Sequence, residues 1–234
     1  MRNHITRITL HPEKYPSDCH YPFSLPIFQQ TKQMRFEFPV TFFVGENGTG
    51  KSTLLEALAI ASNIHIWRKC DGVRFEVNRY EKQLYKYISL KWANGKVPGS
   101  FFGSDIFNDF RRALDSWART DPGQLEYFGG QSLVTQSHGQ SIMSYFRSCY
   151  RRTGIYFLDE PETALSPRSQ LDLLDILREN GKIGHSQFII ATHSPILLAY
   201  EDATIFSFDH TPASEIQYQE TEHYKIYKRF LLDR

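Results

Sequence analysis

Residues Gly45 to Ser52 read GENGTGKS, a glycine-rich loop of the pattern GxxxxGK[ST] between an expected buried strand, residues 40–44, and an expected helix, residues 53–66. Backbone N–H groups of such a loop converge on phosphate oxygens, and the N-terminus of the next helix adds positive potential. We therefore expect Lys51 to bind the β and γ phosphates of a nucleotide and Ser52 to ligate Mg²⁺ through its hydroxyl. The other residues expected to line the nucleotide are Glu46, Asn47, Gly48, Thr49, Gly50 and Thr53.

Two adjacent carboxylates, Asp159 and Glu160, follow a second expected buried strand, residues 155–158. Ligands of open α/β sheets bind at the carboxyl ends of the strands, where these two side chains would lie. Asp159 is suited to the Mg²⁺ shell, which leaves Glu160 to polarise the attacking water. Two solvated acids that begin a loop are the alternative, which the nearby phosphate loop disfavours.

His193 follows a third expected buried strand, residues 188–192. A lone histidine is more often a surface or satisfied polar residue than a functional one. Its position at another strand end favours a role as a hydrogen-bond donor to the γ phosphate, which would sense whether that phosphate is present.

The elements expected to position these residues form an α/β fold, with a mixed, mainly parallel sheet flanked by helices. We expect an antiparallel β part at the N-terminus, a short helical lobe at about 105–150, and a single domain over residues 1–234. The remaining expected strands are residues 5–11 (an antiparallel edge strand), 34–38, 74–77, 85–93, and a terminal hairpin of 203–210 and 215–220. The remaining expected helices are residues 105–118, 139–150, 166–180 and 223–232. Helix 166–180 has Ser166 as its expected N-cap and Gly181 past its end.

Together these motifs resemble those of the ABC-type ATPases, the P-loop family of transporter ATPase subunits and SMC-like ATPases, and the resemblance covers most of the chain. GENGTGKS is similar to Walker A, YFLDEP to Walker B with its glutamate, ALSP to the D-loop, and THS to the switch-histidine segment. The sequence GENGxGKSTLLEA resembles the corresponding sequence of compact stand-alone bacterial ATPases of this type. The resemblance implies ATP and Mg²⁺ as cofactors, Lys51, Glu160 and His193 as catalytic residues, and Ser52 and Asp159 as metal ligands.

The family motif LSGGQ has an altered counterpart in QSHGQS, residues 136–141. Ser137, Gly139 and Gln140 match, whereas Gln136 replaces the leucine and His138 replaces the first glycine. In the family this motif contacts the γ phosphate bound by the opposite subunit, so the resemblance implies a head-to-tail homodimer that forms on ATP binding. Taken alone, the same residues are typical of an ordinary helix N-cap.

Two family features lack an obvious counterpart. The segment SFFGSDIF, residues 100–107, stands where the Q-loop glutamine is expected but has none, and Asp105 is an acidic substitute for contact with Mg²⁺ or water. The aromatic that stacks on adenine has three candidates, Tyr15, Tyr21 and Phe23, for which simple packing is an equal alternative.

Composition limits the function classes. The chain has 234 residues, 41% of them hydrophobic and 23% charged, which excludes disorder as a description of the whole. A net charge of +1 produces no global attraction to nucleic acid or anionic membranes. Cys19, Cys70 and Cys149 are too widely spaced for a disulfide framework or a CxxC metal site. With no apolar run of signal-peptide or membrane-spanning length, we expect a soluble, cytoplasmic protein without direct membrane insertion.

Three alternatives to a hydrolysing homodimer remain at this point. One is a non-hydrolysing ATP sensor or scaffold, and another is the ATP-binding subunit of a transporter with an unidentified protein partner. The third is a DNA-associated ATPase of the repair or defence type. Its basic residues would be Arg147, Arg151, Arg152, Lys225, Lys228 and Arg229. A long DNA-tethering coiled coil is excluded, because the segment between Lys51 and Ser137 is short and has no heptads.

Overall fold

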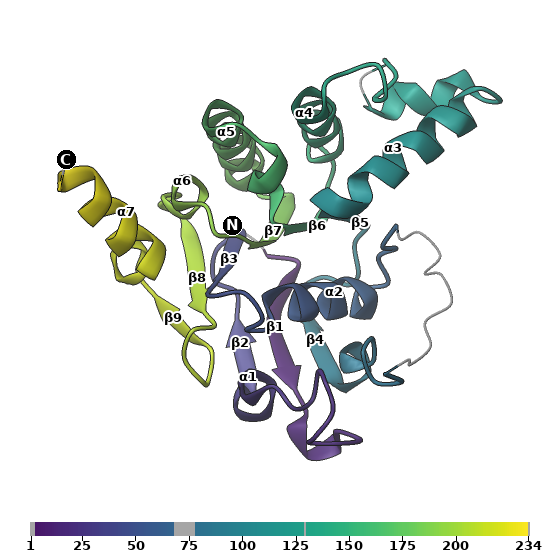
Figure 1. Ribbon diagram of the computed structural model, residues 1–234. Coiled ribbons are helices and arrows are strands. Elements are labelled where there is room, and N and C mark those ends of the chain that lie inside the picture. Colours follow the sequence, from purple (N-terminus) through teal and green to yellow (C-terminus); the bar gives the residue numbers. More distant parts are fainter. Residues whose placement is uncertain (1–2, 68–77, 129, 234) are drawn as a thin grey trace.

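The computed structural model describes residues 3–67, 78–128 and 130–233, in which six strands form a central sheet of order β5-β6-β7-β3-β8-β9 (Figure 1). These strands are β3 (Val40–Val44), β5 (Gly99–Gly103), β6 (Gly154–Asp159), β7 (Ser186–Ala191), β8 (Ala203–Ser207) and β9 (Ser214–Ile216). Neighbouring strands are parallel from β5 to β8, whereas β9 is antiparallel to β8. The expected mixed, mainly parallel sheet is confirmed.

A second, antiparallel sheet lies near the N-terminus. Within the described residues it contains β1 (Ile5–Leu10), β2 (Gln33–Arg35) and β4 (Ile88–Trp92) in the order β2-β1-β4. The prediction that β1 is an edge strand is wrong, because Ile8 pairs with Met34 on one side and with Leu90 on the other. The alternating pattern of β1 indicates only that one face of the strand is buried. Edge strands and central strands of an antiparallel sheet both have such a face, so the pattern does not distinguish them. The strand expected at residues 74–77 lies outside the described residues.

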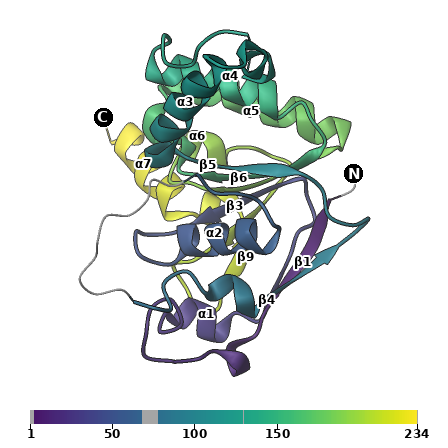
Figure 2. The same ribbon diagram turned by 90° about the vertical axis from the view of Figure 1, so that its right-hand side faces the viewer.

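Helices cover both faces of the central sheet (Figure 2). The helices of the described residues are α1 (Pro26–Gln30), α2 (Lys51–Ala61), α3 (Ser104–Ala118), α4 (His138–Cys149), α5 (Pro167–Ile183), α6 (Pro195–Leu198) and α7 (Glu222–Leu232). Short 3₁₀ turns are η1 (Pro12–Lys14), η2 (Leu84–Tyr87), η3 (Pro122–Phe128), η4 (Pro161–Ala164) and η5 (Tyr218–Glu220). Helices α3, α4 and α5 lie on one face, and α2 lies on the other, next to the antiparallel sheet. None of these helices is both long and apolar enough to cross a bilayer.

Several elements are shorter than the sequence predicts. The helix expected at 53–66 begins at Lys51 and ends at Ala61, and Asn63 just beyond it has a left-handed φ of 66°. The turn η2 takes the first residues of the strand expected at 85–93, and η5 takes the end of the strand expected at 215–220. Apolar alternation does not distinguish a strand from a 3₁₀ turn whose side chains pack partly against the core.

The core has two layers, one on each face of the central sheet. Successive residues of a strand point to opposite faces, so Phe42 packs in the layer under α3, α4 and α5, while Phe43 packs in the layer that contains α2. Phe188 and Ile189 of β7 divide in the same way. All four side chains have no exposed surface. This burial on both faces explains why β3 and β7 read as continuous apolar runs.

Among the strands of the central sheet in the described residues, β5 is the one that the sequence does not predict. It reads GSFFG and pairs in parallel with β6, with Gly103 opposite Asp159. A Cβ at Gly99 would lie 1.9 Å from the backbone oxygen of Ile155, so only glycine allows the two strands to approach here. The flanking glycines that permit this pairing also remove the β-branched pattern by which strands are recognised.

Helix α5 ends later than predicted. Ser166 is the N-cap as expected, with its hydroxyl accepting from the backbone N–H of Ser169 at 3.2 Å. Gly181, however, lies inside the helix, and Gly184 at φ 78° is the left-handed residue that ends it. Both glycines fit the terminal pattern, and only the backbone shows which one has the positive φ.

The two glycines of α5 predict opposite responses to alanine. A Cβ at Gly181 would make ordinary contacts, 3.4 Å from the Tyr200 hydroxyl and 3.8 Å from Pro39 Cβ. We expect Gly181→Ala to raise the free energy of unfolding by about 0.5 kcal/mol, because glycine loses more backbone entropy in a helix. Gly184→Ala should lower it by about 1 kcal/mol, because alanine is strained at positive φ. Urea titration of both variants measures these changes, and a stabilising Gly184→Ala would contradict the assigned helix end.

Candidate functional site

The candidate site residues lie at the carboxyl ends of adjacent parallel strands. The glycine-rich loop follows β3, the Asp159–Glu160 pair closes β6, and His193 lies two residues beyond the end of β7. The register places Asp159 opposite Ala191, and Ala191 opposite Phe43. The structure therefore brings the three motifs to one edge of the sheet.

The glycine-rich loop is held in shape by its own lysine and by a carboxylate from β8. Lys51 Nζ donates to the backbone oxygens of Gly45 at 2.6 Å and Glu46 at 2.8 Å. Asp209, just beyond β8, accepts from the backbone N–H of Glu46 at 2.8 Å. A Cβ at Gly45 would lie 3.0 Å from Asp209 Oδ1, and Gly45 has a φ of 146°. Burial lowers the pKa of Lys51, while the surrounding carboxylates, Glu160 first, oppose that shift.

A hydroxyl and a carboxylate form the candidate metal site. Ser52 Oγ donates to Asp159 Oδ1 at 2.8 Å, which joins the first turn of α2 to the end of β6. Burial raises the pKa of Asp159 to about 7, and nearby Glu160, Glu56 and Asp105 add to the shift. A buried carboxylate among other acids fits a divalent cation, which would supply the missing positive charge. No group of three His, Cys, Asp or Glu ligands occurs in the described residues.

Glu160 has a constrained backbone. Its φ of 44° and ψ of 55° are left-handed, and its N–H donates to the backbone oxygen of Ala191 at 2.9 Å. Non-glycine residues occupy this region at a cost and cluster at functional sites. The carboxylate oxygen Oε1 lies 3.6 Å from Nε2 of His193. The backbone thus aims Glu160 toward the histidine.

His193 is positioned by two neighbours. Its backbone N–H donates to Oε1 of Glu162 at 2.6 Å, and burial raises the pKa of that carboxyl. Its ring Nδ1 lies 3.1 Å from Nε2 of His223 in the first turn of α7. Burial, and then the charge of Lys51, lower the pKa of His193. The ring is therefore mainly neutral at pH 7.

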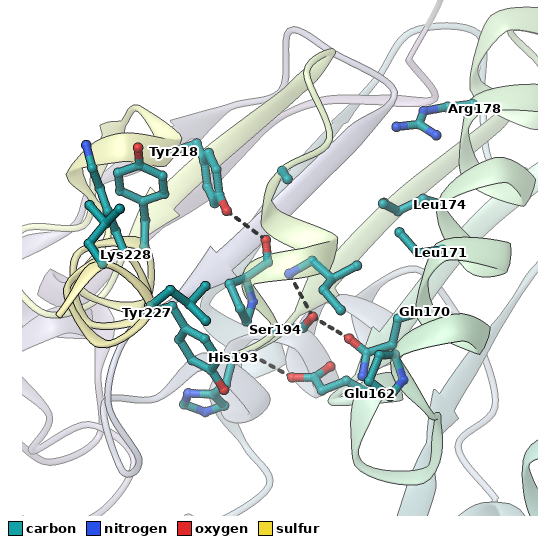
Figure 3. A pocket seen from close by; sticks show the side chains of 17 residues that line it. Glu162, Gln170, Leu171, Leu174, Arg178, His193, Ser194, Tyr218, Tyr227 and Lys228 are labelled. Carbon is teal, nitrogen blue, oxygen red and sulfur yellow. Dashed lines mark hydrogen bonds between the residues drawn. The ribbon is translucent and has the colours of Figure 1, made fainter. Parts of the chain in front are cut away.

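A groove opens beside His193 and Glu162 (Figure 3). Its volume is about 1110 Å³, and helices α5, α6 and α7 supply its walls. Figure 3 shows Glu162 bonded to the His193 backbone and Ser194 bonded to Gln170 of α5. Helix α7 thus forms a wall of the groove next to His193.

The comparisons with known proteins agree with this geometry. Family models match two segments, "AAA domain, putative AbiEii toxin, Type IV TA system" over residues 132–199 and "AAA domain" over residues 25–63. The ferric enterobactin transport ATP-binding protein FepC of Escherichia coli is 30% identical over 156 residues, which cover 59% of this chain and 56% of FepC. The macrolide export ATP-binding/permease protein MacB of Burkholderia thailandensis is 25% identical, covering 69% of this chain and 27% of MacB. The chain thus spans about half or less of these relatives' length.

The structure of cbiO1 from Clostridium perfringens, part of the ABC transporter complex cbiONQ, has a TM-score of 0.50 at 19% identity. The matched region covers 98% of this chain and 95% of cbiO1. The family models, the relatives and the fold together support an ABC-type P-loop ATPase. The resemblance of its motifs to that family is therefore confirmed by fold and by relatives.

The signature-like residues form a helix start, as expected. Ser137 is the N-cap of α4 and forms a capping box with Gln140. Within the described residues, no hydrogen bond joins Ser137, Gly139 or Gln140 to Lys51 or Glu160 of the same chain. A Cβ at Gly139 would instead lie 3.5 Å from a backbone oxygen of the D-loop-like segment. The signature-like start of α4 therefore lies against the D-loop-like segment of the same chain.

Asp105 lies where a Q-loop residue is expected in an ABC-type ATPase. Strand β5 ends at Gly103 opposite Asp159, so Asp105 in the first turn of α3 lies near the candidate metal site. Its charge is one of the causes that raise the pKa of Asp159. The hydroxyl of Ser104 accepts from Thr163 Oγ1 at 2.6 Å, which ties this turn to the segment after Glu160. The role of Asp105 remains a proposal supported by this position.

The three aromatic candidates for adenine stacking differ in exposure. Phe23 has no exposed surface, so the prediction that it could stack on a base is wrong. Tyr15 donates its hydroxyl to the backbone of Phe28 at 3.1 Å and packs on Phe23 with ring centroids 4.6 Å apart. Tyr21 is 41% exposed, and its hydroxyl is hydrogen-bonded to the side chain of Thr53 in α2. Tyr21 is therefore the candidate whose ring is exposed to solvent beside the glycine-rich loop.

Sequence reasoning missed three residues of the site, namely Asp209, Glu162 and His223. Asp209 had a signal, because it follows an apolar strand in the same way as Asp159. Glu162 follows the Walker B segment, where its bond to a distant backbone leaves no trace in the pattern. His223 lies in a helix that the sequence predicts, but nothing in the sequence places that helix next to His193.

Proposed function

We propose that this ABC-type domain binds Mg²⁺ATP and hydrolyses it to ADP and phosphate, as a homodimer that holds two nucleotides head to tail. The observation that carries the proposal is the bond of 2.8 Å from Ser52 Oγ to Asp159 Oδ1, next to a glutamate 3.6 Å from a histidine. This hydrogen bond joins the Walker A-like and Walker B-like segments. Nearby are Glu160, which would activate the water, and His193, which would donate a hydrogen bond to the γ phosphate.

The chain's own residues have distinct proposed roles. Ser52 and Asp159 hold Mg²⁺, which when bound neutralises charge on the phosphate oxygens. The N–H groups of residues 46–53 and the Lys51 ammonium bind the phosphates. Glu160 orients the attacking water and takes its proton as ADP leaves, and the His193 Nε2–H donates to the γ phosphate. Tyr21 stacks on the adenine ring.

The proposed dimer follows from what one chain leaves incomplete. The hydroxyl of Ser137 accepts from the N–H of Gln140 at 3.4 Å, so its proton is free to donate to a phosphate of the partner chain. The start of α4 adds the positive end of a helix dipole. A second copy would complete each site with Ser137, Gly139 and Gln140.

Steady-state phosphate release from the purified chain with Mg²⁺ATP tests this function. Because closure of two chains assembles each site, we expect specific activity to rise with protein concentration and to vanish in EDTA. Ser137→Ala should lower activity about tenfold, as loss of one transition-state hydrogen bond does. Bound ATP with no release at any concentration would favour the non-hydrolysing sensor.

The second candidate is the ATP-binding subunit of a transporter, which the similarity to FepC and cbiO1 favours. Co-purification with a membrane protein from detergent extracts would support it.

DNA binding has less support, because Arg147 pairs with Asp172 at 3.8 Å and Lys225 pairs with Glu222 at 2.7 Å. Stimulation of phosphate release by DNA would favour it over the transporter. The free thiols Cys19 and Cys149 suit our proposal of a cytoplasmic location.

A further inference from the structure

Helix α7 contributes a histidine to the immediate surroundings of the switch histidine. Nε2 of His223 lies 3.1 Å from Nδ1 of His193, and the two ring centroids are 5.2 Å apart. Thr221, the buried N-cap of α7, accepts from the N–H of Tyr224 at 3.2 Å. Tyr218 just before α7 donates to the backbone of Pro195 at 3.0 Å. The Thr221 cap stabilises the first turn of α7, and the Tyr218–Pro195 hydrogen bond and the contact between the two histidines hold this turn against the segment at His193.

The contact between two neutral imidazoles requires one N–H and one lone pair. Burial is the largest cause that lowers the pKa of both His193 and His223. Two tautomer pairs are therefore possible, and they differ in which ring donates. In one pair the Nε2 of His193 carries the proton, and in the other it has a lone pair that cannot donate to a phosphate.

Two observations select between these pairs. Glu160 Oε1 is an acceptor 3.6 Å from Nε2 of His193, which favours a proton on that nitrogen. Nδ1 of His223 is buried without a hydrogen-bond partner in the described part of the chain. A lone pair on that nitrogen is less costly than a buried N–H without an acceptor, so the proton of His223 belongs on Nε2. Both point to donation from His223 to His193.

We propose that His223 is a positioning residue, which donates from Nε2 to Nδ1 of His193 and so keeps a proton on Nε2 of His193. That nitrogen is itself buried without a hydrogen-bond partner in the described residues, and the γ phosphate would provide its acceptor. The consequence for turnover rests on the proposed ATPase function. The tautomer itself is a property of the chain without nucleotide.

Three variants of the full chain test the proposal. His223→Phe keeps the ring but removes the donor, and His223→Gln places an amide donor near the position of Nε2. His65→Phe is a matched control, because His65 is exposed and distant in sequence from α7. Circular dichroism of each variant establishes that it is folded.

The first readout is the ¹⁵N spectrum of the histidine rings, which reports the tautomer without any ATP. We expect His193 to have its proton on Nε2 in the native chain, in His223→Gln and in His65→Phe. In His223→Phe the ring should become a mixture of both tautomers. A native His193 with its proton on Nδ1, or one unchanged in His223→Phe, would overturn the proposal.

The second readout is kcat for phosphate release, measured in a double-mutant cycle with His193→Ala. Loss of one neutral hydrogen bond should make His223→Phe about fivefold slower in the native background. It should cause no further loss with His193→Ala, whereas two independent structural effects would multiply. His223→Gln should restore kcat to within about twofold of the native chain. If the native chain releases no phosphate, the proposed function fails, while the ring spectra still decide the role of His223.

Discussion

Glu160→Gln is expected to lower kcat for ATP hydrolysis about a thousandfold while ATP binding is retained. Glutamine keeps the shape of the side chain and suits the same backbone, but it cannot take the proton of the attacking water. The Ser52–Asp159 pair and the phosphate loop stay intact, so the metal and the phosphates should bind as before. The variant should therefore accumulate as an ATP-bound dimer.

Phosphate release and size-exclusion chromatography with ATP measure the two effects. The matched control is Glu201→Gln, an exposed acid on the loop before β8, which should leave both unchanged. A monomeric Glu160→Gln at saturating ATP would contradict the head-to-tail dimer. Turnover near the native rate would remove Glu160 from the catalytic role.

Mixing two impaired variants, one with strongly reduced and one with about tenfold lower activity, gives a further test of the dimer. In a mixed dimer of Glu160→Gln and Ser137→Ala, one composite site has both defects and the other has neither. Random pairing should restore about a quarter of native turnover, because half of the dimers are mixed and each has one intact site. A mixture no more active than the average of its components would mean that both residues act in the same chain.

Phe188→Ala is expected to lower the free energy of unfolding by about 4 kcal/mol. Phe188 has no exposed surface, stacks on Tyr156 with centroids 5.4 Å apart and meets Tyr150 edge-on at 5.3 Å. It lies on β7, between β6 and β3, so the cavity left by the ring cannot be filled from solvent.

Urea unfolding of the purified chain measures this loss. Phe230→Ala is the matched control, because Phe230 is 54% exposed on α7 and its removal should change stability by less than about 0.5 kcal/mol. Equal losses in the two variants would contradict the assignment of β7 to the core.

The sequence predicted the parts of the site that short-range patterns report. A glycine-rich loop between an apolar strand and a helix, and acids or a histidine directly after apolar strands, define positions that parallel pairing must bring to one edge. Gly45, Asp159 and His193 belong to this class. Their placement needed only the order of the elements and the rule that ligands bind at strand ends.

The missing parts depend on contacts between distant segments. β5 needs glycine because a carbonyl of β6 lies against it, and the sequence shows only a weak strand. Gly181 and Gly184 are equivalent helix ends until the backbone dihedral is known. His223 and Asp209 act on residues that are far away in the chain, and one sequence cannot report such pairs.

The parallel register of β6, β7 and β3 has a consequence for how this domain tolerates change. Neighbouring strands lie about 4.8 Å apart, so the spacing between the strand ends is fixed by the sheet. Insertions in the connecting segments do not change this spacing, because backbone hydrogen bonds inside the core set the register of Asp159, Ala191 and Phe43. The spacing between Asp159, His193 and the glycine-rich loop is thus set by strand geometry, and changes in the surrounding helices need not alter it.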